Sequence, residues 1–414
     1  MAPIEPERNG LRAIPRGVWV LGFVSLFMDV SSEMIHALLP VYLVAVLGAS
    51  ALTVGFIEGI AEATAMITKI FSGVLSDWLG RRKLLAAIGY GLSAFTKPIF
   101  PLASTVGWLV AARFIDRVGK GIRGAPRDAL VGELSPQAVR GASYGLRQSL
   151  DTVGAFLGPL AAIALMVLTS DNYTFVFWVA VIPAFVSFGL MTFGVEEPVR
   201  DARKTNSRRL RLRDAKRLPR AFWVVVAATG ILTLARFSEA FLLLKARDVG
   251  LAVALVPAVL VVMNIAYALS AYPAGALSDR LGRGGVLLSG VALLALADLV
   301  LAFAGTLPWM VVGTLIWGLH MGLTQGLLAT LVADTAPEDL RGTAFGIFNL
   351  AGGVAMLLAS VIAGALWDAY GPMTTFLAGA AVTSVAFAWL MVIEWHRGRG
   401  RDPDGEATPT GARY

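Results

Sequence analysis

The feature that most constrains this chain is a series of apolar runs, each about as long as the hydrocarbon core of a bilayer is thick. Residues 285–304 hold a single charged residue, and residues 373–393 hold none. At 1.5 Å per helical residue, a run of about 20 residues crosses that core of roughly 30 Å. The composition agrees, because 57% of the residues are hydrophobic and 15% are charged, against about 25% charged in soluble domains. The chain is therefore expected to lie in a membrane.

Turn and charge signals between the apolar runs divide the chain into twelve expected spanning helices. The predicted fold class is an all-α integral membrane protein. The expected helices are residues 17–47, 51–77, 83–102, 105–124, 140–169, 173–194, 221–246, 251–277, 284–304, 308–332, 342–368 and 372–395.

Lys and Arg residues alternate between the loops, and this alternation indicates orientation. They are frequent in both tails and in the even-numbered loops, and they are densest between Arg200 and Arg220. The odd-numbered loops are nearly free of them, apart from Lys245 and Arg247. By the positive-inside rule, both termini are expected in the cytoplasm. The formal net charge of +7 then reports membrane topology, and no nucleic-acid partner is expected.

The chain also repeats itself. Residues 73–81 (GVLSDWLGR) return as residues 275–283 (GALSDRLGR), and residues 133–145 return more weakly as residues 334–346. Ser32-Glu33 likewise has a counterpart in Ser238-Glu239. The expected organisation is a cytoplasmic tail (1–16), a six-helix bundle (17–195), a basic cytoplasmic linker (196–220), a second six-helix bundle (221–396) and a disordered tail (397–414).

These residues resemble the major facilitator superfamily over nearly the whole chain. The segment from Gly73 to Lys83 resembles the loop signature of that family between helices two and three, although Trp78 replaces a usual basic residue. The resemblance implies two bundles related by a pseudo-two-fold axis, which rock to expose a central site to each side of the membrane in turn. It also implies a cytoplasmic latch made of Gly73, Asp77, Arg81, Arg82, Asp279 and Arg283.

The fifth expected helix resembles a more specific pattern. Its Gly145, Gly154, Gly158 and Pro159 match the spacing of a motif of proton-coupled exporters in this family, although Ala162 and Ile163 replace the final glycines. The resemblance implies the antiporter branch. The alternative explanation is close helix packing, which small residues permit in lipid whatever the protein carries.

Several charged residues fall inside the expected helices, where each costs about 2.5–3.5 kcal/mol at the bilayer centre and must be paired, hydrated or functional. Asp29, Glu33 and His36 share one face of the first helix. Desolvation favours a protonated carboxyl group and a nearby cation favours the ionised one, so a group under both influences can load and release a proton. We expect Glu33, with Asp29 or Glu239, to carry the coupling proton. The proton gradient is then the energy source, and no cofactor is expected.

Arg113 and Arg236 favour an anionic or zwitterionic solute, because a guanidinium group stays charged when buried and binds carboxylate or phosphate in bidentate fashion. The alternative is that Asp116 and Glu239 neutralise the two arginines in place. The expected substrate-binding residues are His36, Glu58, Glu62, Arg113, Arg236, Asn264, Tyr267, Trp317, His320 and Gln325.

Other membrane-embedded charges have a structural explanation. One ion-pair network is expected from Asp116, Arg117, Arg147 and Asp151. The side chains expected to extend toward a membrane surface are those of Lys97, Lys120, Arg123 and Arg127.

The sequence gives little support to an enzyme. The chain has no cysteine, and residues 119–121 (GKG) lack the spacing of a Walker loop. No metal-ligand spacing is present, so no metal is expected. The expected function is proton-coupled export of a drug or of an anionic or zwitterionic metabolite, by a monomer in the lipid bilayer of a bacterial inner membrane. The alternatives are proton-coupled uptake of an organic anion (an organic acid, a sugar phosphate or a siderophore) and a receptor that keeps a transporter fold.

Overall fold

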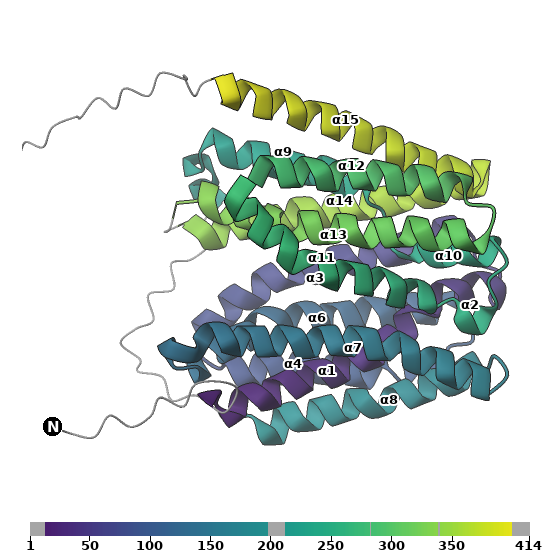
Figure 1. The fold of residues 1–414 in the computed structure, drawn as a ribbon. Helices are drawn as coiled ribbons and strands as arrows, with labels where there is room; N and C mark the ends of the chain where they lie inside the picture. Colours follow the sequence, from purple (N-terminus) through teal and green to yellow (C-terminus); the bar gives the residue numbers. More distant parts are fainter. Residues whose placement is uncertain (1–12, 198–211, 282, 338–339, 400–414) are drawn as a thin grey trace, which may run out of the picture.

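The computed structural model describes residues 13–197, 212–281, 283–337 and 340–399, and it contains no strand in those ranges (Figure 1). The helices of the N-terminal half are α1 (Arg16–His36), α2 (Leu39–Ala45), α3 (Ala51–Leu79), α4 (Arg82–Thr96), α5 (Ile99–Leu102), α6 (Val106–Leu134), η2 (Gln137–Val139), α7 (Arg140–Leu168), α8 (Tyr173–Gly189) and η3 (Leu190–Gly194). Those that follow are η5 (Leu212–Arg217), α9 (Arg220–Ala235), α10 (Ala240–Asp248), η6 (Val253–Leu255), α11 (Ala258–Leu281), α12 (Arg283–Phe303), α13 (Leu307–Thr335), α14 (Arg341–Tyr370) and α15 (Pro372–Arg399).

Within the described residues, ten helical segments are long and apolar enough to cross a membrane. The two expected spans outside this set correspond to α4, which has 15 residues, and to α6, which carries a row of charged side chains. Both pack among the long helices, because α6 contacts α3 and α4. The all-α membrane fold is confirmed, and the count of twelve spans stays a prediction.

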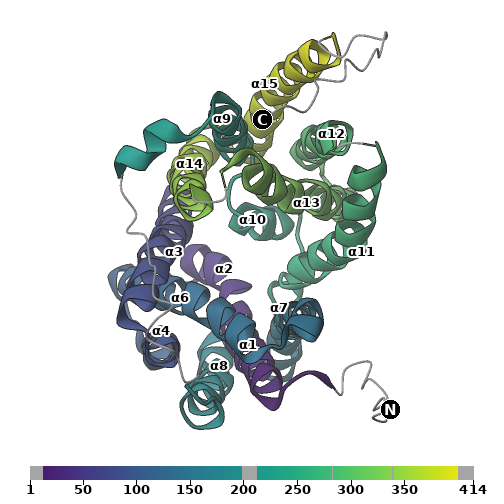
Figure 2. The ribbon, with the colours of Figure 1, turned by 90° about the vertical axis from the view of Figure 1, so that its left-hand side faces the viewer.

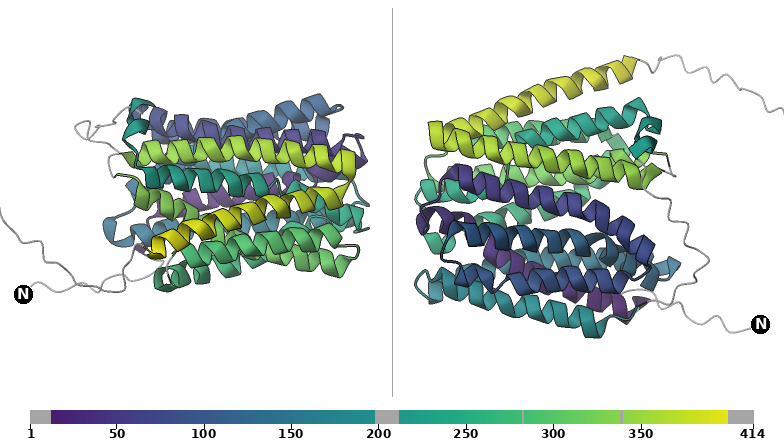
Figure 3. Two further views of the ribbon diagram at one scale, coloured as in Figure 1. Left: turned by 90° about the horizontal axis from the view of Figure 1, so that it is seen from above. Right: turned by 180° about the vertical axis from the view of Figure 1, so that it is seen from behind.

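The long helices run between the same two ends of the molecule (Figure 3). Figure 2 shows α1–α8 gathered on one side and α9–α15 on the other, with α2 and α10 near the centre of the view. We call one end the basic end, because six of the described helices begin there at arginines (left in Figure 1). These are Arg16, Arg82, Arg140, Arg220, Arg283 and Arg341. The other end is called the opposite end.

Two helices are broken in the interior of the molecule, one in each half. The first break separates α1 from α2 after His36, and the second separates α9 from α10 over residues 236–239. In the second break the backbone of Arg236 leaves the helical region (φ −98°, ψ 83°), and the Ser238 hydroxyl accepts the N–H of Ala240 at 3.2 Å. Non-helical backbone at membrane depth is tolerated where it is buried in protein or lines a water-filled cavity. The breaks therefore mark a candidate site.

The two halves meet along α3 and α14, which pack side by side; we call this contact the α3–α14 seam. Glycines permit the close approach. A Cβ atom added at Gly59 would lie 3.0 Å from the Leu357 Cα, and one added at Gly364 would lie 2.6 Å from the Leu52 Cα. Nearer the basic end, Gly346 is still in contact range of α3. The seam is thus closed along most of its length.

The contact between α7 and α11 has a different shape. Where α11 begins, α7 contacts both α11 and the short helix η6 that precedes it. From there the two helices diverge toward the basic end (Figures 1 and 2). On this side the halves are therefore together at the opposite end and apart at the basic end.

A carboxylate also joins the halves at the opposite end. Asp368 of α14 accepts hydrogen bonds from the backbone N–H groups of Ala51 (2.9 Å) and Leu52 (2.8 Å), the first two residues of α3. These N–H groups have no partner inside their own helix, and a helix N-terminus carries a partial positive charge. Asp368 thus caps a helix of the other half.

Replacing Asp368 by Ala is expected to favour the conformation that is open at the opposite end. Loss of a helix cap costs about 0.5–2 kcal/mol, which is roughly a 2- to 30-fold change in a conformational equilibrium. The measurement is the labelling rate of a single cysteine placed at Leu38, which is fully buried, in a chain that has no cysteine of its own. The control is Asp248→Ala, because Asp248 pairs with Lys245 inside one half. An unchanged labelling rate in Asp368→Ala would show that the cap does not hold the halves together.

The internal repeat reappears in the contacts at the basic end. Arg82 at the start of α4 pairs with Glu133 near the end of α6 at 3.1 Å. Arg283 at the start of α12 pairs in the same way with Asp334 near the end of α13. Each half therefore ties the same two helices together by an ion pair at the same end.

The end expected for the fourth span is wrong, and the spans expected at 17–47 and 221–246 are interrupted by the two breaks. The span predicted to end at residue 124 continues as α6 to Leu134, through Pro126 and several charged residues. The charged residues of this extension suggest a loop, but Arg127 and Asp128 form ion pairs with Asp151 and Arg147 of α7. The expected N-terminal tail, linker and C-terminal tail fall largely on residues 1–12, 198–211 and 400–414, outside the described residues.

Candidate functional site

A charged central cavity lies between the two halves, at the depth of the two helix breaks. Two of its compartments have volumes of about 470 and 320 Å³. They share lining residues from both halves, so we treat them as one space and call it the central cavity. The shared residues are Glu33, Glu62, Met66, Lys120, Ala155 and Asn264.

Carboxylates from both halves face the central cavity. Glu33 of α1 and Glu239 of the second break line the same compartment, and Asp29 lines the larger one. The Glu33 side chain is 21% exposed, and its carboxylate lies 3.2 Å from Nδ1 of His36. Nε2 of His36 lies 3.5 Å from the carboxylate of Glu58. The structure therefore brings together the carboxylates that the sequence predicted for proton coupling.

Arg113 does not line the central cavity, so its expected role in substrate binding is wrong. Its guanidinium is 2% exposed and donates to the carboxylate of Glu58 at 2.7 Å. Glu58 projects from α3, which packs against α6. An unpaired buried charge would cost several kcal/mol, and the pair avoids this. Arg113 thus holds α6 to α3.

The expected single ion-pair network is wrong in its pairing, because its four members divide into two sets. In the first set, Asp116 pairs with Lys97 at 3.1 Å and Arg117 pairs with Glu62 at 3.3 Å. Lys97 was expected to reach a membrane surface, but it is 1% exposed and also donates to Ser32 at 3.1 Å. This set ties α4, α6, α3 and α1 together.

The second set lies nearer the basic end and joins α6 to α7. Asp151 pairs with Arg147 at 2.5 Å and with Arg127 at 3.6 Å. Arg147 and Arg127 both also contact Asp128. Asp116 and Arg117 lie three turns away along α6, too far to share these partners.

The basic side chains of α6 line the central cavity, which the sequence did not predict. Lys120, Arg123 and Arg127 were expected to extend toward a membrane surface, but all three line the larger compartment with Lys69 of α3. Arg123 is also stacked over the Tyr90 ring at 5.0 Å and donates to Ser93. Helical spacing could have indicated this inward position, because Lys120, Arg123 and Arg127 continue the helical face of Arg113, Asp116 and Arg117.

Two glycines of the fifth-span motif bring α7 against the carboxylate face of α1. A Cβ atom at Gly154 would lie 3.0 Å from the Asp29 Cβ, and one at Gly158 would lie 2.6 Å from the Glu33 Cβ. Gly145 of the same motif has no atom within 4 Å of such a Cβ, and Pro159 lies inside the helix. Gly154 and Gly158 therefore position the α1 carboxylates, whereas Gly145 makes no close contact.

The substitution Gly158→Ala is expected to lower thermal stability. The added methyl group has no space, because it also meets the Val30 carbonyl oxygen at 2.9 Å, and overpacking costs about 1–3 kcal/mol. Gly145→Ala is the matched control, since its methyl group is unobstructed and Ala favours a helix by about 1 kcal/mol. Thermal unfolding of the purified variants measures both. Equal unfolding temperatures would contradict the packing role of Gly158.

Besides Glu239, the second half contributes neutral polar side chains and one arginine to the cavity. Asn264 and Tyr267 of α11 line the larger compartment of the central cavity, and Arg236 and Gln325 line the smaller one. A third compartment of about 210 Å³ extends from Arg236 and Gln325 to His320. The expected role of Trp317 as a cavity wall is wrong. It is fully buried and packs against Phe237 with ring centroids 5.6 Å apart.

The expected latch is only partly described. Arg82 pairs with Glu133 and Arg283 with Asp334, and a Cβ atom at Gly73 would lie 3.4 Å from the Ala125 Cβ. Arg81 is exposed. The side chains of Asp77 and Asp279 lie outside the described part of the structure. The described residues also contain no group of three or more side chains that could hold a metal ion.

Two helical bundles around a charged cavity, closed at one end and apart at the other, define a carrier of solutes. The sequence profile of the Major Facilitator Superfamily matches residues 21–244 and 231–412. The chain belongs to that family: it is a multi-pass membrane transporter and not an enzyme.

Known proteins agree with this assignment. The chain is 31% identical to an uncharacterized MFS-type transporter of Methanocaldococcus jannaschii, covering 94% of this chain and 98% of that protein. It is 25% identical to the inner membrane transport protein YajR of Escherichia coli, covering 91% and 82%. Among solved structures, the nucleoside transporter NupG matches with a TM-score of 0.77, covering 91% of this chain and 99% of that one. Its sequence identity of 14% means that it shows the fold alone.

Proposed function

We propose that this transporter is a proton-coupled exporter of an anionic or zwitterionic organic solute. The observation that carries the proposal is that Glu33 and Glu239, from opposite halves, line one compartment together with Lys120 and Arg236. Carboxylates can bind protons, and the two cations can bind an anionic group of the solute. Both kinds of group lie where a rocking motion of the halves changes access to them together.

Exchange of protons for solute follows from competition between them. When Glu33 is ionised, it can bind a cationic group of a zwitterionic solute, and protonation of Glu33 removes that attraction, so a bound proton and a bound solute exclude each other. Lys120 and Arg236, which line the same compartment, can then bind the anionic group of that solute. The α7 glycines support this role of Glu33, because they bring α7 against the α1 segment that carries it.

The orientation follows from the charge of the loops. Under the positive-inside rule, the basic end lies in the cytoplasm, and the conformation described is then open toward the cytoplasm. The bacterial inner membrane fits a relative such as YajR of Escherichia coli, which is named as an inner membrane transport protein. We propose that the protein works there as a monomer.

The test uses purified protein in liposomes that contain a pH-sensitive dye. A stability screen against drugs, organic acids, sugar phosphates and siderophores first selects a solute. When that solute then enters the vesicles down its gradient, antiport raises the lumenal pH and symport lowers it. A fall would replace export by uptake of an organic anion, and solute binding without any flux would identify a receptor.

A further inference from the structure

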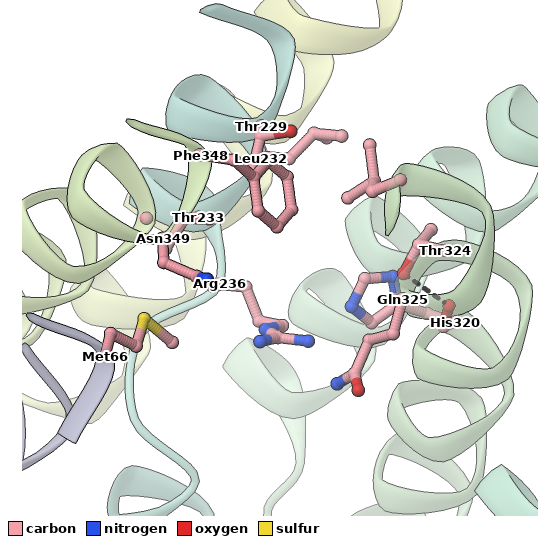
Figure 4. Close-up of a pocket in the computed structure, with 12 residues that line it drawn as sticks. Met66, Thr229, Leu232, Thr233, Arg236, His320, Thr324, Gln325, Phe348 and Asn349 are labelled. Carbon is pink, nitrogen blue, oxygen red and sulfur yellow. Dashed lines mark hydrogen bonds between the residues drawn. The ribbon is translucent and has the colours of Figure 1, made fainter. Parts of the chain in front are cut away.

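The third compartment, of about 210 Å³, is lined mainly by the second half, beside the break between α9 and α10, with Met66 of α3 from the first half. It has twelve lining residues, and we call it the Arg236 pocket. Figure 4 shows the guanidinium of Arg236, the ring of His320 and the amide of Gln325 facing the same space. These three side chains come from the helix break and from two successive turns of α13. Since a liquid water molecule takes about 30 Å³, the pocket has room for roughly seven waters or a small organic group.

The pocket differs from the rest of the central cavity in its charge. None of its twelve described lining residues is Asp or Glu, and Arg236 is the charged side chain among them. The guanidinium of Arg236 makes no ion pair or hydrogen bond within the described part of the chain. Its five N–H donors are thus available, and they match the two oxygens of a carboxylate or phosphate.

His320 supplies the second observation. It is 3% exposed, and among the described residues neither Nδ1 nor Nε2 makes a hydrogen bond of good geometry, with the Gly290 backbone as the nearest candidate partner. A buried polar group without a partner costs about 1–3 kcal/mol, so such a group in a pocket wall indicates a ligand or water that satisfies it. The imidazole ring has at least one N–H donor in any protonation state.

The hydroxyl groups of the pocket leave few other donors. Thr229 donates to the Val225 carbonyl oxygen at 2.9 Å, and Thr324 donates to the His320 carbonyl oxygen at 2.9 Å. The donors left for a ligand are therefore Arg236, His320, the amide groups and the hydroxyl of Thr233, which also lines the pocket.

The remaining wall of the pocket is apolar. It is formed by Met66 of α3, Leu232 of α9, Leu328 of α13 and Phe348 of α14. A pocket with apolar walls and a few convergent polar groups is the usual form of a small-molecule site. Here the convergent groups are donors, one of them permanently charged.

We propose that the Arg236 pocket binds the anionic end of the transported solute, and that this solute is a small organic oxyanion with an apolar body. Arg236 holds the carboxylate or phosphate oxygens, His320 and Gln325 donate to them, and the apolar wall receives the adjoining hydrocarbon. A cation is disfavoured, because none of the twelve residues that line the pocket is Asp or Glu. This assignment rests on the proposed function only in naming the bound molecule as the transported one.

The test is equilibrium binding to the purified full chain, measured by thermal shift with three probes of one shape. Benzoate is the anion, benzamide the neutral analogue and benzylamine the cation; phenyl phosphate then separates phosphate from carboxylate recognition. We expect benzoate or phenyl phosphate to bind at least about 10-fold more tightly than benzamide, the effect of one charge-assisted contact. Equal affinity for benzamide, or tighter binding of benzylamine, would overturn the proposal.

Variants locate the binding site. Arg236→Gln is expected to weaken binding of the anion by about 10-fold or more, and His320→Phe, which keeps a ring but removes the donors, by a smaller factor. Arg247→Gln is the matched control, because Arg247 is exposed near the opposite end and lines none of the cavity compartments described. If Arg236→Gln does not fold, Arg236→Lys keeps the charge and loses the planar fork, and it should still weaken binding. Unchanged affinity in both Arg236→Lys and His320→Phe would place the anion elsewhere.

These outcomes separate the pocket from the proposed function. Anion binding that depends on Arg236, without proton-linked flux, would keep the pocket and reject proton-coupled export. Proton-linked flux of a solute whose binding is unaffected by the Arg236 and His320 variants would keep proton-coupled transport and reject the pocket as the binding site.

Discussion

Replacing Glu33 by Gln is expected to uncouple solute movement from the proton gradient while leaving the protein folded. Gln keeps the size of the side chain and an oxygen that can accept from His36 at the 3.2 Å position, but it cannot take up a proton. Coupling free energies between sites are typically about 1–3 kcal/mol, so proton-linked flux should fall roughly 5- to 150-fold. The measurement is the lumenal pH change during solute entry into liposomes.

The control for this variant is Glu196→Gln, which changes an exposed carboxylate beyond α8 and outside the central cavity. It should keep the full pH signal. Solute exchange in the absence of a gradient should survive in Glu33→Gln, since the cations of the cavity remain. A full pH signal in Glu33→Gln would remove Glu33 from the coupling step and leave Asp29 and Glu239, which also line the cavity, to be tested in its place.

The second large effect is expected at the buried pair of Arg113 and Glu58. Arg113→Met leaves the Glu58 carboxylate, which is 1% exposed, with only the 3.5 Å contact to His36. Removing one partner of a buried ion pair costs about 3–5 kcal/mol, because the other charge stays buried without compensation. The unfolding temperature in detergent should fall markedly.

The matched experiment is the double variant Arg113→Met/Glu58→Leu. Replacing both members of a buried pair by apolar residues is often neutral or stabilising by about 1–4 kcal/mol. The double variant should therefore unfold well above the single one. If the two unfold at the same temperature, Arg113 contributes by packing and not by its charge.

Much of the fold could be predicted because short stretches of the sequence determine where the helices lie and how the two halves correspond. The apolar runs predict helices, and the repeated segments predict two related halves, which the matching Arg82–Glu133 and Arg283–Asp334 pairs display. The break after His36 was not predicted, although Pro40 follows it closely. The end of α6 was misplaced, because charges were interpreted as a loop when other helices supply their partners.

The candidate site was predicted in outline, because helical spacing shows which side chains share a face of one helix. It does not show which helix that face meets. From the sequence, Arg113 and Lys97 cannot be told apart from cations that line a cavity or reach a membrane surface. The packing of α6 against α3 and α4 shows that each is buried in an ion pair, Arg113 with Glu58 and Lys97 with Asp116. Lys120 and Arg123 show the opposite error, since the cavity that they line lies between helices far apart in the chain.

The α3–α14 seam determines where a solute can pass. Two bodies joined along one edge open as a wedge, and the wide side of this wedge lies between α7 and α11 (Figure 1). Both helices carry exposed apolar side chains, among them Leu157 of α7 and Leu269 and Tyr272 of α11. Exposed apolar side chains contact acyl chains in a membrane. A solute with a hydrocarbon body is then expected to reach the wide side of the wedge from within the bilayer, without first crossing the aqueous phase.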